Sequence, residues 1–73
     1  MNTFYVAGQN ESKWIGINAK NLRGAKVIAS RMYQKCTGGR FDIAEKMTYE
    51  NGEGEYVVVA YWSGESWSWV DAK

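Results

Sequence analysis

Seventy-three residues, of which 45% are hydrophobic and 23% charged, suffice for one small globular domain. The absence of histidine and the single cysteine exclude an internal disulfide, a cysteine-rich zinc site, and Ser-His or Cys-His nucleophile pairs within this chain. No apolar run approaches the ~20 residues of a membrane span, and the first residues lack the pattern of a signal peptide. We therefore expect a single cytosolic domain over residues 1–73.

The net charge of +1 hides a strong asymmetry between the two halves of the chain. Residues 1–40 hold seven lysines and arginines against one glutamate, whereas residues 41–73 hold two lysines against seven acidic residues. Such an asymmetry favours a charged partner. The alternative is that the two halves pack together and that their charges interleave into an ordinary mixed surface.

The N-terminal part of the chain predicts a β-hairpin. Apolar and polar residues alternate over residues 3–7 and again over residues 13–19, and a polar turn sequence separates the two runs. Because side chains alternate across a strand, the second run places Ile15 and Ile17 on one face and Trp14 on the other.

After this hairpin the hydrophobic period changes to three and four residues, which predicts a helix. One apolar stripe runs from Leu22 to Cys36. Asn21 is a good N-cap, and Gly38 suits a left-handed C-cap. Cys36 lies on the stripe and has no histidine partner, so we interpret it as a buried core thiol. Gly24 costs the helix up to ~1 kcal/mol relative to alanine, unless it allows close packing on a sheet.

Three more strands are predicted in the C-terminal half. Residues 40–49 alternate except at Glu45, where we expect a bulge or a sheet edge. Asn51-Gly52 predicts a hairpin turn. Residues 55–62 are apolar on both faces, which places them centrally in the sheet, and residues 67–70 form the last short strand.

The order of these elements, ββαβββ, defines the expected fold class. With short loops it predicts an α+β fold of two layers, in which one amphipathic helix packs on a mostly antiparallel sheet. One helix cannot cover both faces of a sheet. Some of the eleven aromatic residues should therefore be exposed or half-exposed.

The candidate binding residues are basic side chains on the helix and its flanks, and tryptophans. The basic side chains suit nucleic acid or an acidic protein surface, although a solvated helix face has the same composition. Tryptophans commonly anchor protein interfaces, whereas stacking of single-stranded bases is disfavoured here because the aromatic-rich half is also acidic. The candidate partner-binding residues are Lys20, Arg23, Lys26, Arg31, Lys35, Arg40, Trp14, Trp67 and Trp69.

The spacing of the carboxylates does not favour a cation site or a catalytic pair. Glu50, Glu53 and Glu55 surround the predicted turn, so we expect solvated side chains rather than a cation site or a catalytic pair. Thr37-Gly38-Gly39-Arg40 follows the helix, whereas a phosphate-binding loop precedes one. We expect a non-enzymatic protein without a metal or another cofactor.

The segment from Ile17 to Ser30, with its small residue, capped helix and Ala-Lys pair, resembles small phage proteins that disable host machinery. In length and in residues 1–8 the chain is similar to the RNA-polymerase-binding transcription regulators of Xanthomonas lytic phages, and the strand-strand-helix-strand order is similar to that of a coliphage RNA polymerase inhibitor. The resemblance implies a regulator in the host bacterial cytoplasm that binds the β′ subunit of RNA polymerase near the RNA exit path. Such a regulator interferes with sigma-dependent promoter engagement and allows antitermination.

A second resemblance is to anti-CRISPR inhibitors of type I-F complexes. It covers residues 25–30 and the terminal Trp69-Val70-Asp71, and it implies that the basic face competes with target DNA. A third hypothesis is a small nucleic-acid-binding module that uses the basic face alone. We expect a monomer, although an exposed aromatic face would equally suit a homodimer interface.

Overall fold

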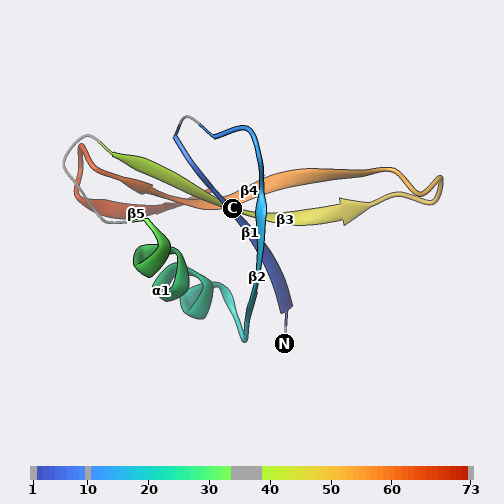
Figure 1. Cartoon of the computed structure of the whole chain (residues 1–73), viewed down its shortest axis with the longest axis horizontal. Coiled ribbons are helices and arrows are strands. Elements are labelled where there is room, and N and C mark those ends of the chain that lie inside the picture. Colours follow the sequence, from blue (N-terminus) through green and yellow to red (C-terminus); the bar gives the residue numbers. More distant parts are fainter. Residues whose placement is uncertain (1, 10, 34–38, 73) are drawn as a thin grey trace.

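A computed structural model, which describes residues 2–9, 11–33 and 39–72, places one helix on one face of a five-stranded sheet (Figure 1). The elements are β1 (Asn2–Gly8), β2 (Ile15–Ala19), α1 (Leu22–Met32), β3 (Arg40–Thr48), β4 (Gly54–Ser63) and β5 (Ser68–Asp71). The predicted order ββαβββ and the two-layer α+β architecture are confirmed.

The sheet has the strand order β2-β1-β3-β4-β5, and every neighbouring pair is antiparallel. It follows that β2 and β3 run parallel to each other with β1 between them. Parallel strands need a crossover connection, which α1 supplies. The apolar strand β4 lies inside the sheet, between β3 and β5, and β3 occupies the centre.

The core lies between α1 and the sheet. Ala25 and Ala29 are completely buried on the inner side of the helix, and their small side chains let the helix approach the strands. Ile43 and Val6 are the largest completely buried side chains. The strand residues of the core come from β1, β2, β3 and β4, and comprise Phe4, Val6, Ala19, Phe41, Ile43, Val59 and Trp62.

The helix begins as predicted and ends earlier. The Asn21 Oδ1 accepts a hydrogen bond of 2.9 Å from the Gly24 amide, which is the expected N-cap. The predicted continuation to Cys36 is wrong, because α1 ends at Met32 and the backbone of Tyr33 is extended, with φ −121°. Cys36 and the Gly38 cap lie outside the described residues.

Tyr33, the first residue after the helix, makes two contacts with other parts of the chain. Its ring stacks on Phe41 of β3, with 5.6 Å between the ring centroids. Its hydroxyl donates a hydrogen bond of 2.9 Å to the Glu11 Oε2, which lies in the β1–β2 connection. These contacts connect the end of the helix to β3 and to the β1–β2 connection.

Strands β3 and β4 contain a bulge. Their register shifts between Ile43 and Ala44, which makes Val59 of β4 the extra residue. We predicted the irregularity at Glu45 of β3, but the extra residue lies in β4. There the neighbouring residues are all apolar, so the alternation of the sequence could not reveal it.

The bulge decides which face of the sheet the aromatic residues of β4 occupy. Tyr56 is opposite Lys46, and Tyr61 is opposite Asp42, two residues of β3 that point to the same face. Tyr56 and Tyr61 are five residues apart, so in a regular strand they would point to opposite faces. With the bulge, both lie on the face that α1 does not cover.

Beyond the bulge, β3 and β4 continue as a two-stranded arm, residues 45–56, which projects from the rest of the molecule (Figure 1). The register pairs β1 with residues 41–44 of β3, and β5 with residues 60–63 of β4, so no strand flanks the arm among the described residues. The predicted turn is confirmed, with Gly52 at φ +86°. Glu50, Glu53 and Glu55 are exposed around it, as expected.

Candidate binding surfaces

The outer side of α1 carries a cationic stripe with an apolar residue in its middle. Arg23, Val27 and Arg31 are spaced by four residues, and all three are exposed. The helix contains no acidic residue, and within the described residues neither arginine has an ion-pair partner. Lys20, exposed just before the helix, extends the positive charge. Among the residues that the structure describes, nothing neutralises these cations, so they are available to an acidic partner.

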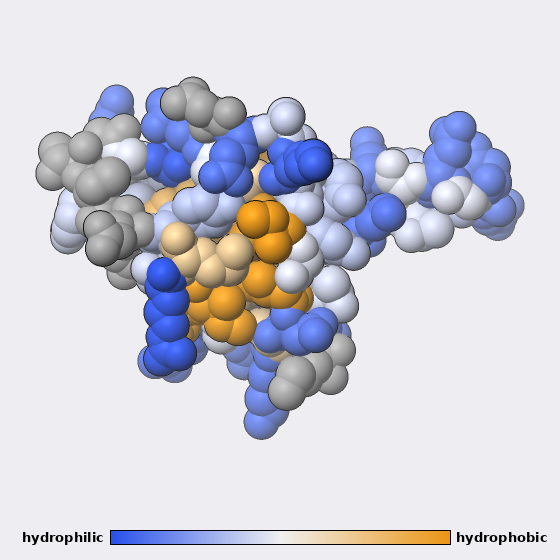
Figure 2. All heavy atoms as spheres, viewed as in Figure 1, coloured by the Kyte–Doolittle hydropathy of each residue, from blue (hydrophilic) through white to orange (hydrophobic). Residues whose placement is uncertain are grey.

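An apolar patch accompanies this stripe, over α1 and β2 (Figure 2). Val27 is 50% exposed and Ile15 is 44% exposed, whereas Ile17 and Ile28 are partly buried against the core. Exposed apolar side chains beside cations are typical of protein-binding surfaces. We call this the α1–β2 surface, and it consists of Ile15, Ile17, Arg23, Val27, Ile28 and Arg31.

Lys26, a predicted binding residue, instead connects the helix to β5. Its Nζ lies 2.8 Å from the Asp71 Oδ1 and 5.7 Å from the centroid of the Trp69 ring. Trp69 is half-buried and packs edge-on against Phe41 and Trp62. Lys26 and Trp69 therefore connect the helix to β5.

Arg40 is not part of the helix surface either. It begins β3 on the opposite face of the sheet, where its guanidinium carbon lies 4.0 Å from the centroid of the Tyr61 ring. Its Nε donates a hydrogen bond of 2.9 Å to the Asp42 Oδ1. The predicted basic cluster is thus divided between two faces. Lys35, the remaining member, lies outside the described residues.

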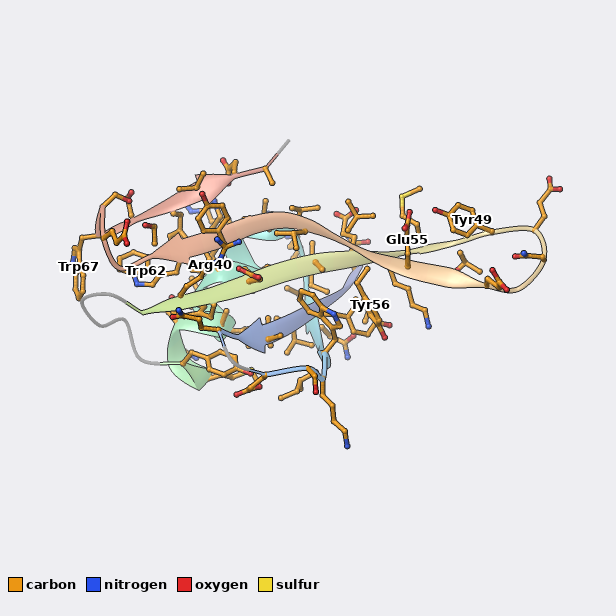
Figure 3. The ribbon with its side chains drawn as sticks, turned by 90° about the horizontal axis from the view of Figure 1, so that it is seen from above. Arg40, Tyr49, Glu55, Tyr56, Trp62 and Trp67 are labelled. Carbon is orange, nitrogen blue, oxygen red and sulfur yellow. The ribbon has the colours of Figure 1, made fainter. Side chains whose placement is uncertain are left out.

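The uncovered face of the sheet carries an aromatic cluster around Tyr56 (Figure 3). Trp14 stacks on Tyr56 with 5.4 Å between the centroids and 20° between the planes. Tyr5 meets the same ring edge-on at 5.0 Å. The Lys46 Nζ lies 5.7 Å from the centroid of Tyr56. The predicted exposure of aromatic residues outside the helix layer is confirmed, and Trp14 belongs to this cluster.

Trp67 differs from the other predicted tryptophans. It is exposed and packs edge-on against Trp62 at 5.1 Å. We expected it to begin the last strand, but its φ of +53° places it in the turn, and β5 starts at Ser68. A left-handed backbone is unusual for a bulky residue, and the glycine of this turn, Gly64, stands three positions earlier, so it does not signal the left-handed residue.

Two tyrosine hydroxyls donate to carboxylates. Burial, together with the hydrogen bond to Glu11, raises the pKa of Tyr33 above its ordinary value. The hydrogen bond to Glu55 raises the pKa of Tyr49, in the arm, in the same direction. Both shifts favour the neutral phenol. Neither tyrosine is therefore activated as a nucleophile or a base.

The surface hollows of the described residues are polar and open. One, of about 310 Å³, lies on the uncovered face beside Arg40, Tyr61 and Ser63. Another, also of about 310 Å³, lies between β1 and the arm, beside Thr3 and Lys46. Within the described ranges, no three histidine, cysteine, aspartate or glutamate side chains are placed to hold a metal ion. None of the helical segments described has the length and apolar character to cross a membrane.

Sequence reasoning missed the residues that complete each surface. The sequence places Ile15 on one face of a strand, but it does not show that this strand lies beside α1. Tyr5 and Lys46 were not considered as binding residues, because their proximity to Tyr56 depends on the β1–β3–β4 register. The period-two alternation that places Tyr5 and Trp14 on one face was a usable signal, whereas the bulge at Val59 had none.

Comparisons with known proteins find no similar family or protein. No protein-family model matches the chain, and the searches of curated proteins and of solved structures return no match. The functional argument therefore depends on the two surfaces described above.

Proposed function

We propose that this chain is a small non-enzymatic binding protein that regulates host transcription, with the α1–β2 surface as its contact to RNA polymerase. The observation that carries the proposal is the combination of exposed isoleucine and valine with unpaired arginines on one side of the molecule. Apolar side chains give a protein interface its desolvated centre, and the flanking charges steer the encounter and set its specificity.

The proposal identifies the partner as the β′ subunit, which follows from the resemblance of the sequence to phage-encoded polymerase regulators. A stoichiometric ligand near the RNA exit path would interfere with sigma-dependent promoter engagement and allow antitermination. The cationic stripe fits an acidic protein surface, and Val27 between the two arginines fits an apolar contact. A site for duplex DNA alone would gain nothing from that exposed valine, because phosphates are recognised by charge.

The test is a pull-down from a bacterial lysate with tagged protein, treated with nuclease and washed at moderate salt. We expect recovery of the two large polymerase subunits. The double variant Arg23→Glu/Arg31→Glu should lose at least ~10-fold of this recovery, because it reverses both unpaired cations of the surface. Lys26 is left intact, since its reversal would break the contact with Asp71 and confuse folding with binding.

The matched control is Lys13→Glu, which reverses an exposed cation that belongs neither to the α1–β2 surface nor to the aromatic cluster around Tyr56. It should keep the polymerase recovery of the wild type. Recovery of Cas proteins instead would replace the proposal with the anti-CRISPR alternative. Loss of all bound protein on nuclease treatment, or full recovery with the double arginine variant, would overturn it.

A further inference from the structure

On the uncovered face of the sheet, the surroundings of Tyr56 differ from those of Tyr61, which has Asp42 opposite it and shares a surface hollow with Glu65. Along β3, the residues that point to this face are Arg40, Asp42, Ala44 and Lys46, as the register with Tyr5, Tyr56 and Tyr61 requires. Glu45 has the opposite parity and points with Ile43 to the other face. The central strand therefore presents two cations and one carboxylate on the uncovered face.

The carboxylates of the arm are directed elsewhere. Glu55 is opposite Met47, which shares the parity of Ile43 and Glu45, so Glu55 also belongs to the other face. Glu50 and Glu53 lie in the turn at the end of the arm. Asp42, which remains on the uncovered face, already accepts a hydrogen bond from Arg40. The register therefore directs the strand carboxylates Glu45 and Glu55 away from Tyr56, whereas Asp42 and Glu65 remain near Tyr61.

The aromatic side chains of this face offer a flat surface beside positive charge. Tyr56 is 40% exposed, Trp14 stacks on its ring, and Tyr5 packs against it edge-on. Lys46 lies over the same ring. Five residues along β4, Tyr61 carries the Arg40 guanidinium. Figure 3 looks onto this face from the side away from the helix, and it shows Arg40 and Tyr56 along the same strand pair.

We propose that the uncovered sheet face, centred on Tyr56 and Lys46, binds single-stranded nucleic acid. Exposed aromatic rings on an open sheet stack unpaired bases, and neighbouring lysines and arginines hold the phosphates. Lys46 is placed to bind one phosphate, and Arg40 can bind a second through the guanidinium N–H groups other than the Nε that is bonded to Asp42, while Tyr56 and Trp14 provide the stacking surface. The site is distinct from the α1–β2 surface. The nucleic-acid proposal therefore goes beyond the proposed protein contact and can be tested independently of it.

The test is fluorescence anisotropy with fluorescein-labelled 12-nucleotide oligo-U and oligo-dT at low salt. We expect binding that weakens with salt at a log-log slope of about −1.4, which corresponds to two phosphate contacts on a single strand. Lys46→Gln should reduce the slope to about −0.7. Tyr56→Ala should weaken binding by about tenfold through the loss of one stacked base, whereas Tyr56→Phe should keep most of the affinity.

The control variant is Arg23→Gln, which removes one cation from the α1–β2 surface as Lys46→Gln removes one from this face, and which should keep the salt slope of the wild type. Thermal melts establish that each variant is folded, and Lys46→Gln, at an exposed position, remains informative if Tyr56→Ala does not fold. A 12-base-pair duplex should compete poorly, because its bases are already stacked.

Three outcomes would overturn the proposal. The first is no binding of either oligonucleotide at low salt, and the second is equal binding of single strand and duplex. The third is that Tyr56→Ala leaves the affinity unchanged but converts a dimer to a monomer by light scattering, which would make this face a contact between two copies. If the polymerase contact fails while the oligonucleotides bind as described, this proposal stands without it.

Discussion

Strands β3 and β4 pass through two different environments. On one side of the bulge, Phe41, Ile43 and Trp62 are buried beneath α1 and β5 contributes a further strand. On the other side, in the arm, Met47 and Tyr49 are exposed and no strand flanks the pair among the described residues. One continuous pair of strands is thus part of the core at one end and a projecting ribbon at the other.

The comparison teaches what stabilises each part. The covered part gains from apolar burial, which contributes ~25 cal/mol per Å² removed from water. The arm depends on its ladder of backbone hydrogen bonds and on pairs such as Tyr49 with Glu55, and two-stranded ribbons are marginal in water. Tyr56 and Lys46 lie where the arm joins the sheet, so the proposed nucleic-acid site is connected to the rigid part.

The largest predicted effect compares two residues of β3 that point to the same face. Ile43→Ala should lower the free energy of unfolding by about 3–4 kcal/mol, because it leaves a cavity at a completely buried position. Met47→Ala, at a position that is 52% exposed in the arm, should change it by less than about 0.5 kcal/mol. Urea unfolding followed by tryptophan fluorescence measures both.

For a domain of this size the total stability is of the order of 4–11 kcal/mol, so Ile43→Ala would remove a large share of it. A similar loss in both variants would contradict the comparison, because it would mean that the arm is packed as tightly as the covered part.

The next effect concerns α1, which covers the core end of β3 and β4 but not the arm. Asn21→Ala should destabilise the protein by about 1 kcal/mol, since the Gly24 amide loses its side-chain acceptor. Asn21→Ser, which keeps an acceptor, should recover most of this loss. Equal thermal shifts for the two variants would show that the cap does not contribute through this hydrogen bond.

A smaller, stabilising effect is expected from Gly24→Ala. We had considered that Gly24 allows the helix to approach the sheet closely. A Cβ at this position would lie 3.6 Å from the Ala19 Cβ, which is an ordinary contact, so close packing does not require glycine here. The substitution should therefore raise stability by about 0.5 kcal/mol through helix propensity, and a lower melting temperature would show that the helix has to move.

Much of the fold could be predicted because local signals agreed with each other. The period-two runs at residues 3–7 and 13–19, the cap at Asn21 and the Asn51-Gly52 turn each identified an element that the structure contains. These signals are local, and the bulge is not. It depends on how β3 and β4 align over their length, and the apolar run around Val59 fits either register.

The candidate binding residues were harder to predict, because their positions also depend on non-local contacts. Lys26 and Arg31 both lie on the helix, but only Lys26 reaches β5, where Asp71 engages it. Arg40 was grouped with the helix on charge alone. It is the first residue of β3, and its side chain points to the face of the sheet that α1 does not cover. Charge is visible in a sequence, whereas the face on which a charge emerges is set by tertiary structure.

The smallest predicted effect depends on pH and compares Tyr33, against the covered core, with Tyr49 in the arm. Both have a raised pKa, so the folded state holds the phenol proton more tightly than the unfolded state does. Stability is therefore independent of these groups below about pH 10 and falls as the pH rises through the folded pKa. Because Tyr33 stacks on Phe41, its ionisation should couple to global unfolding.

Above about pH 10, the stability of Tyr33→Phe should fall less steeply with pH than that of the wild type, as measured by urea unfolding at a series of pH values. Tyr49→Phe is the matched control, since it removes the same hydroxyl–carboxylate pair from the arm. Its profile should follow the wild type more closely, because the contact of Tyr49 with Glu55 can open while the covered part stays folded. Identical profiles for the two variants would mean that the arm and the covered part unfold as one unit.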